Sequence, residues 1–202
     1  MLPFLLACGS PTPVDPGFDL QPLEDNTAPV PDVAGVLTTV SGEDEANDRF
    51  WAHARGRVDA DPATVWEALQ VLDVIVDRRE VDLYSYAPDP TLGYDRAFQV
   101  DNEVDDLITV RFRLTWVHEL QIGPEEAPER VLVRWDKTHG TAFIDLLSGT
   151  VELTARDDGT TDLAFVEHLR AAARDEATIE QYLEDLFADV VAWSAGEALP
   201  TF

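Results

Sequence analysis

The stretch "DEATIEQYLEDLFADVVAWSAG" (residues 175–196) is the segment of the chain that decides its fold. Its apolar residues recur at the i, i+3, i+4, i+7 spacing of an amphipathic helix, and Asp and Glu cover the opposite side. These apolar residues are Ile179, Tyr182, Leu183, Leu186, Phe187, Val190 and Val191. Either Asp175 caps the N-terminus or Thr178 and Gln181 form a capping box, and Gly196 ends the helix. About 20 residues at roughly 1.5 Å each predict a helix long enough to cross a whole sheet.

The segment directly upstream, "SGTVELTARDDGTTDLAFVEHLRA" (148–171), predicts a β-hairpin. Apolar residues alternate with polar ones on both sides of Asp158-Gly159, which is a favoured pair for a tight turn. The alternating apolar residues are Val151, Leu153 and Ala155 before the turn, and Leu163, Phe165 and Leu169 after it. The long helix therefore follows directly on a pair of antiparallel strands.

The middle of the chain is rich in strand patterns. In "LITVRFRLTWVHELQI" (107–122) the even-numbered positions other than His118 are apolar, while polar or charged residues occupy most odd positions. This alternation predicts a sheet with one face in the core and one face in water. The segment "RVLVRWDKT" (130–138) alternates in the same way, whereas the acidic run "DNEVDD" (101–106) is interpreted as a solvated hairpin loop.

A helix start stands out before these strands. In "DPATVWEALQVL" (61–72), Asp61 is a plausible N-cap and Pro62 occupies the first helical position, where its missing N–H costs nothing. The preceding "FWAHARGRVDA" (50–60) has β character, and "DVIVDRREVDLYSY" (73–86) is interpreted as a second short helix that runs into a strand.

This order of elements resembles the START-like helix-grip superfamily (SRPBCC), the polyketide cyclase and lipid-transfer group. The likeness is carried by "GRVDADPATVWEAL" (56–69), "GTVELTARDDGTTDLAFVEHL" (149–169) and "TIEQYLEDLFADVVAWSAG" (178–196). The resemblance implies an α+β fold in which a curved antiparallel sheet wraps around the C-terminal helix, with short helices after the first strand. It also implies a cavity between sheet and helix, which members use for sterols, phospholipids, polyketides or plant hormones. The superfamily shares no catalytic residues.

Six side chains are candidates for binding a ligand in such a cavity. Trp116, Trp135, Tyr182 and Phe187 would supply large apolar walls with polar tips, although each also suits a plain core. His118 and Glu167 share the inward parity of their apolar neighbours, and together they are weak candidates for an acid–base pair. Their structural alternatives are a satisfied histidine near a strand end and a glutamate paired with an arginine.

The N-terminal residues suggest attachment to a membrane. Leu5-Leu6-Ala7-Cys8 resembles the bacterial lipobox, in which the cysteine is lipidated after cleavage, and Cys8 is the only cysteine of the chain. The apolar stretch is short and lacks a preceding cation, so we expect the true start to lie upstream. Residues 1–8 are therefore interpreted as a signal remnant, 9–48 as an acidic, Pro-rich disordered tether, and 49–202 as the START-like domain.

Composition limits the classes of partner. With 40 acidic and 14 basic residues the net charge is −26, which argues against nucleic-acid binding. A single cysteine cannot form an internal disulfide, and the sequence gives no motif for zinc or for a cofactor. Lys137 and His139 could end a strand near a cavity mouth or belong to a turn.

The sequence predicts an envelope lipoprotein, lipid-anchored through Cys8 at the outer membrane or the periplasmic face, whose START-like domain binds a hydrophobic or lipid-like ligand. The protein would be cytoplasmic if Cys8 is not processed. Two other functions remain open: a cyclase- or dehydratase-type enzyme that uses polar groups in the same cavity, and a non-enzymatic protein-interaction module.

Overall fold

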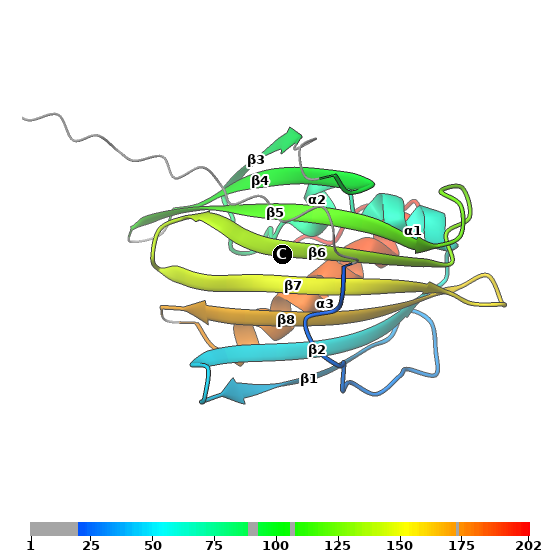
Figure 1. Ribbon diagram of the computed structural model, residues 1–202, viewed down its shortest axis with the longest axis horizontal. Coiled ribbons are helices and arrows are strands. Elements are labelled where there is room, and N and C mark those ends of the chain that lie inside the picture. The colour runs from blue at the N-terminus through cyan, green and yellow to red at the C-terminus, as the bar shows by residue number, and fades with distance from the viewer. Residues whose placement is uncertain (1–19, 89–92, 106–107, 173) are drawn as a thin grey trace, which may run out of the picture.

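The computed structural model describes residues 20–88, 93–105, 108–172 and 174–202. Within them, eight strands form one antiparallel sheet in the order β1-β2-β8-β7-β6-β5-β4-β3 (Figure 1). The strands are β1 (Leu37–Asp44), β2 (Arg49–Val58), β3 (Leu83–Pro88), β4 (Arg96–Asp105), β5 (Thr109–Ile122), β6 (Arg130–Gly140), β7 (Ile144–Ala155) and β8 (Thr161–Ala171).

Three helices in the described residues follow the predicted signals. In α1 (Pro62–Ala68) the Asp61 side chain accepts a hydrogen bond from the Thr64 backbone N at 3.1 Å. A four-residue α2 (Leu72–Ile75) follows, and α3 (Glu176–Ser194) closes the fold. Asp175 is the cap of α3, and it forms its capping box with Thr178 rather than leaving that role to Thr178 and Gln181.

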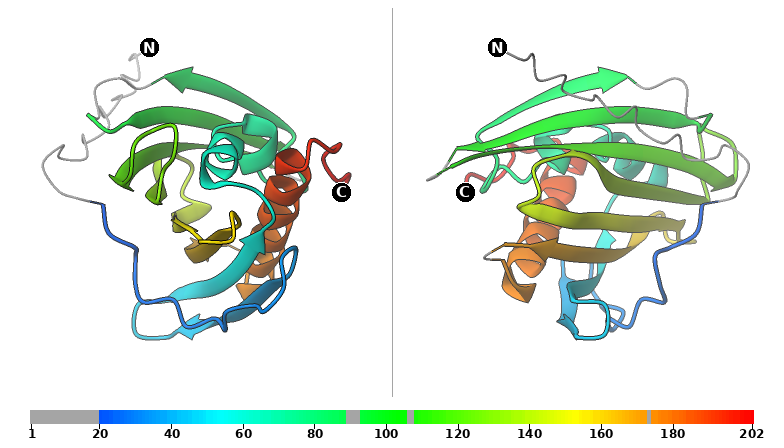
Figure 2. Two further views of the ribbon diagram at one scale, coloured as in Figure 1. Left: turned by 90° about the vertical axis from the view of Figure 1, so that its right-hand side faces the viewer. Right: turned by 60° about the vertical axis from the view of Figure 1, so that its left-hand side comes forward.

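The sheet curls around α3, and the three helices lie on its concave side (Figure 2). Apolar residues of α3 such as Ile179, Leu183 and Leu186 are buried against the inward residues of the strands. This is the α+β helix-grip architecture that the sequence predicted, and β7 and β8 form the predicted hairpin, with Asp158-Gly159 in its turn.

The prediction that residues 9–48 form a disordered tether is wrong for the described part of that range, residues 20–48. Residues 37–44 form the edge strand β1, so the domain begins before residue 49. Residues 20–29 run across the outer face of the sheet, as the dark blue segment of Figure 1 shows. The side-chain amide of Asn26 donates to the backbone carbonyls of Ala54 (3.0 Å) and Phe165 (2.7 Å), which ties this segment to β2 and β8. Residues 9–19 lie outside the described residues.

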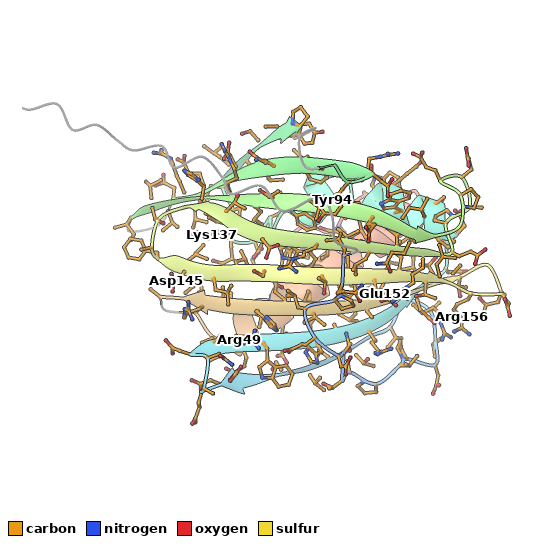
Figure 3. The ribbon with its side chains drawn as sticks, in the orientation of Figure 1. Arg49, Tyr94, Lys137, Asp145, Glu152 and Arg156 are labelled. Carbon is orange, nitrogen blue, oxygen red and sulfur yellow. The ribbon has the colours of Figure 1, made fainter. Side chains whose placement is uncertain are left out.

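The same segment covers part of the sheet face that was predicted to be in water. Leu20 is buried against Val117 and Leu132, outward-facing residues of β5 and β6. Further along, the Glu24 carboxylate accepts from His53 Nε2 (2.9 Å) and contacts Arg49 (3.3 Å), a residue labelled on β2 in Figure 3. Composition indicated disorder because the segment has little apolar surface; polar contacts with distant strands hold it instead.

The prediction that the acidic run 101–106 forms a solvated hairpin loop is also wrong for residues 101–105, because β4 continues through Asp105. Two of its carboxylates face arginines on the neighbouring strand. Asp101 pairs with Arg113 at 2.7 Å and Glu103 with Arg111 at 2.6 Å, in each case between directly opposite residues of β4 and β5. These cross-strand pairs offset the like-charge repulsion that suggested a solvated loop.

Candidate functional site

A row of directly opposite residues crosses the concave face of the sheet. Phe98 on β4 lies opposite Trp116 on β5, and Trp116 lies opposite Trp135 on β6. The row continues through Gly149 on β7 to Glu167 on β8. Three aromatic side chains, a glycine and a carboxyl group are thus brought side by side by strand register alone.

The glycine in this row is what lets the aromatic surface reach the carboxyl group. Trp116 and Trp135 stack with ring centroids 4.8 Å apart, and the Trp135 indole lies over the backbone of Gly149. A Cβ at residue 149 would lie only 2.0 Å from Cζ2 of Trp135. Because residue 149 has no side chain, the indole extends across β7 toward Glu167 on the next strand.

A cavity of about 100 Å³ lies between this row and the N-terminal half of α3. Trp116, Trp135 and Glu167 line it from the sheet, and Ile179 and Tyr182 from the helix. Most of the remaining lining is apolar: Ile75, Val76, Val81, Val100, Val104, Phe112, Leu114, Ile144, Leu147, Leu169 and Ala171.

The loop between α2 and β3, residues 76–82, closes one side of the cavity with Asp77 and Glu80. Ion pairs hold this loop against α3 and against Arg174, which lies just before the Asp175 cap of that helix. Arg79 binds Asp185 at 2.9 Å, and Glu80 binds Arg174. Arg78 Nη2 lies 2.6 Å from Asp189, whose side chain is only 2% exposed. The cavity wall on this side is therefore fixed by ion pairs, of which Glu80–Arg174 lines the cavity itself.

Glu167 is the most unusual group of the site. The residue is 1% exposed, and within the described residues its Oε2 has no hydrogen-bond partner. Burial raises its pKa well above the ordinary glutamate value, and the charge of Asp77 raises it further. The Trp135 indole opposes the shift in pKa, although its Nε1 makes no hydrogen bond of normal geometry. A carboxyl group whose neutral form is favoured by burial, and which has an unused oxygen, thus faces an apolar cavity.

Glu167→Gln is expected to stabilise the protein at alkaline pH. Because the folded state holds this proton more tightly than the unfolded state, the wild type loses stability as pH rises from about 4.5 toward the raised pKa. Glutamine removes that loss, so the variant gains on the wild type with rising pH when both are unfolded in urea. Glu184→Gln on the exposed side of α3 is the control. Equal pH slopes in all three proteins would contradict a buried, protonated Glu167.

Four of the six predicted site residues line the cavity, namely Trp116, Trp135, Glu167 and Tyr182. Phe187 does not, because its ring packs directly on Gly56 of β2, where a Cβ would lie 2.2 Å from the ring. His118 does not either. It is fully buried two residues beyond Trp116, and its Nδ1 accepts from the indole N–H of Trp66 on α1 at 2.9 Å. The structure therefore does not bring His118 and Glu167 together as an acid–base pair in one cavity.

We expect His118 to lower the free energy of unfolding as the pH falls below about 6.5. Burial, with the nearby charge of Arg96, lowers its pKa to about 3, so below pH 6.5 the unfolded state binds a proton that the folded state resists. Between pH 6.5 and pH 4 the free energy of unfolding should fall by about 3 kcal/mol because of this one group. Urea unfolding of Trp66→Phe, which keeps the histidine, should show the full loss, and the double variant with His118→Phe should lack it. The same slope in both would contradict the assignment.

The remaining predicted residues lie away from the cavity lining. Lys137 and His139 belong to the last part of β6, with His139 exposed, so they do not form a turn. Cys8 lies outside the described residues. In the described part of the chain no cluster of three or more histidine, cysteine or acidic side chains is placed to hold a metal ion. No helix in that part is both long and apolar enough to cross a membrane.

Two residues that shape the site, Asp77 in the cavity lining and Gly149 beneath Trp135, were not foreseen from the sequence. Asp77 lies in an irregular loop, where no periodicity indicates which way a side chain points. Gly149 could have been found, because the alternation of residues 130–138 and 148–155 permits a register that places it opposite Trp135. Nothing in a single sequence, however, singles out that register.

Comparison with known proteins identifies solved structures that share this fold. No protein-family model matches the sequence, and no curated protein matches it. The structure is similar to the lipid transfer and protein localization domain of human StarD13 (DLC2), with a TM-score of 0.57, 8% identity and coverage of 88% of this chain and 91% of that one. It is also similar to a STAR-related lipid transfer protein from Xanthomonas axonopodis, with a TM-score of 0.56, 12% identity and coverage of 84% and 97%. The chain thus has the START-like helix-grip fold.

Proposed function

We propose that this protein binds a small apolar ligand in the cavity between the sheet and α3. The observation that carries the proposal is the Trp116–Trp135 stack, which forms part of an apolar cavity wall that the protein's own side chains leave unfilled. The two similar solved structures, a lipid-transfer domain and a lipid-transfer protein, support this kind of ligand. The volume of about 100 Å³ favours a single short chain or ring over a phospholipid with two acyl chains.

Binding of this kind predicts a ligand that co-purifies with the protein. Protein isolated from its native source without detergent and examined by native mass spectrometry should carry a bound small apolar molecule. Ile179→Trp, which places an indole in the cavity, should purify without it. Detection of the same molecule on both proteins would refute the proposal. So would a wild type that carries no such molecule and also fails to bind added 1-octanol.

We further propose that Cys8 attaches the protein to the cell envelope. The support is the sequence Leu5-Leu6-Ala7-Cys8 and the absence of any other cysteine in the chain. Metabolic labelling with a fatty-acid analogue should label the wild type and not Cys8→Ser, and only the wild type should pellet with membranes. Equal labelling and fractionation of both proteins would contradict this attachment.

Two observations bear on the other candidate functions. An enzyme that uses His118 with Glu167 would need them in one cavity, and the structure separates them. A protein-interaction module would be expected to have a filled core and a continuous exposed apolar patch. The cavity between the sheet and α3 is instead left unfilled by the protein's own side chains, which a filled core does not predict. Binding of a small apolar ligand is therefore the function that the geometry supports best.

A further inference from the structure

Three polar residues that line the cavity use their hydrogen-bond donors inside the protein. The Tyr182 hydroxyl donates to the carbonyl of Ile75 at 2.9 Å, and the Asn102 amide donates to the carbonyl of Val100 at 3.1 Å. The hydroxyl of Thr178 donates to the Asp175 cap of α3. A ligand that only accepts hydrogen bonds therefore finds few free donors among these residues. In the described lining, the Trp135 indole N–H and the proton of Glu167 are the buried donors without a partner.

Carboxyl groups dominate the polar part of the lining. Glu167 is buried with an unbonded Oε2, and Asp77 is near enough for its charge to raise the pKa of Glu167. One oxygen of Asp77, Oδ1, accepts from the backbone N–H groups of Arg79 and Glu80, at 3.1 and 3.2 Å. Two acidic groups thus approach the same apolar space.

The arginines around the cavity pair with other carboxylates. Arg78 binds Asp189, Arg79 binds Asp185, and Arg174 binds Glu80. In the described part of the chain, no ion pair or hydrogen bond joins Glu167 to a cation, and its buried Oε2 is unbonded. The partner that this acidic end of the cavity lacks is a positive charge that brings its own donors.

We propose that the ligand is a small apolar molecule with one protonated amine, and that its ammonium group binds beside Glu167 and Asp77 while its apolar part lies against Trp116 and Trp135. This deepens, and rests on, the proposed function. An ammonium group carries three N–H donors and no acceptor, which complements a wall of acceptors. It also gains from the face of a neighbouring indole. An ammonium group also favours the ionised form of Glu167, so its binding releases the proton that the empty site holds. A carboxylate or phosphate ligand instead gains nothing from ionisation of Glu167 and lies near the acidic Asp77, so we expect it to bind more weakly.

Three ligands with the same eight-carbon chain separate these chemistries: n-octylamine, 1-octanol and octanoate. Isothermal titration calorimetry at neutral pH should give octylamine an affinity about tenfold or more above octanol, and octanoate the weakest binding. Glu167→Gln should lower the affinity for octylamine by about tenfold and leave that for octanol within about twofold. Glu184→Gln removes one exposed charge from α3 and should leave both affinities unchanged. Circular dichroism verifies that each variant is folded.

The outcomes distinguish this inference from the proposed function. If octanol or octanoate binds at least as tightly as octylamine, or if Glu167→Gln keeps the full preference for the amine, the amine inference is overturned while apolar ligand binding stands. If the wild type binds none of the three ligands, both proposals fail. A preference for octylamine that disappears in Glu167→Gln and persists in Glu184→Gln supports the inference.

Discussion

Gly149→Val is expected to abolish binding of apolar ligands and to lower the free energy of unfolding by about 1–3 kcal/mol. The Trp135 indole occupies the space where the new side chain would begin, with Cζ2 and Cε2 only 2.0 and 2.1 Å from the position of a Cβ. The indole must therefore leave the backbone of β7 and turn into the cavity, which is too small to hold both an indole and a ligand. Urea unfolding and calorimetry with 1-octanol measure the two effects.

A second substitution shows whether the steric cause is right. Trp135→Ala in the Gly149→Val background removes the atoms that the valine displaces, so the double variant should recover stability relative to Gly149→Val alone. The two changes should be strongly non-additive in a double-mutant cycle, because the residues are in contact. Additive effects, or a Gly149→Val variant that binds octanol as well as the wild type does, would contradict the role of Gly149.

Arg78→Ala is expected to cost about 3–5 kcal/mol of folding free energy, because it leaves the buried carboxylate of Asp189 without a cation. One guanidinium nitrogen of Arg78 lies 2.6 and 2.7 Å from the two oxygens of Asp189, and another donates to the carbonyl of Pro200 at 3.1 Å. Loss of these contacts frees the 76–82 loop, which carries Asp77 and Glu80 of the cavity wall. Hydrogen exchange in this loop should rise together with the loss of stability.

The matched control for this prediction replaces both charges. Arg78→Met combined with Asp189→Leu removes the buried carboxylate as well as its cation, and should recover most of the stability that Arg78→Ala loses. Urea unfolding at neutral pH compares the three proteins. A cost below about 1 kcal/mol for Arg78→Ala would show that this ion pair does not hold the loop against α3.

The elements that the sequence predicted well are those whose signals are local. A capping aspartate, a proline at the first helical turn and a 3.6-residue repeat specify α1 and α3 because each acts within one or two helical turns. The hairpin around Asp158-Gly159 is specified by alternation and by a tight turn. The ordered segment 20–29 carries no such signal, because its hydrogen bonds reach partners such as Phe165, far away in the sequence.

The candidate site was predicted in part for the same reason. Strand parity places Trp116, Trp135 and Glu167 on the inner face, and the helical repeat places Tyr182 toward it. Parity does not show where along a strand the cavity ends, so His118, two residues beyond Trp116, was grouped with the site although Trp66 covers it. Phe187 was grouped with it because the helical stripe does not show that α3 touches the sheet directly at Gly56.

The central claim is that apolar guests enter the space between the sheet and α3. Nuclear magnetic resonance of the protein with 1-octanol tests it most directly, through intermolecular Overhauser effects between the alkyl chain and assigned side chains. We predict contacts to the indole protons of Trp116 and Trp135 and to the methyl groups of Ile179, which line the cavity. Contacts confined to residues of the outer sheet face, such as Arg111 and His139, or no contacts at saturating octanol, would contradict the account.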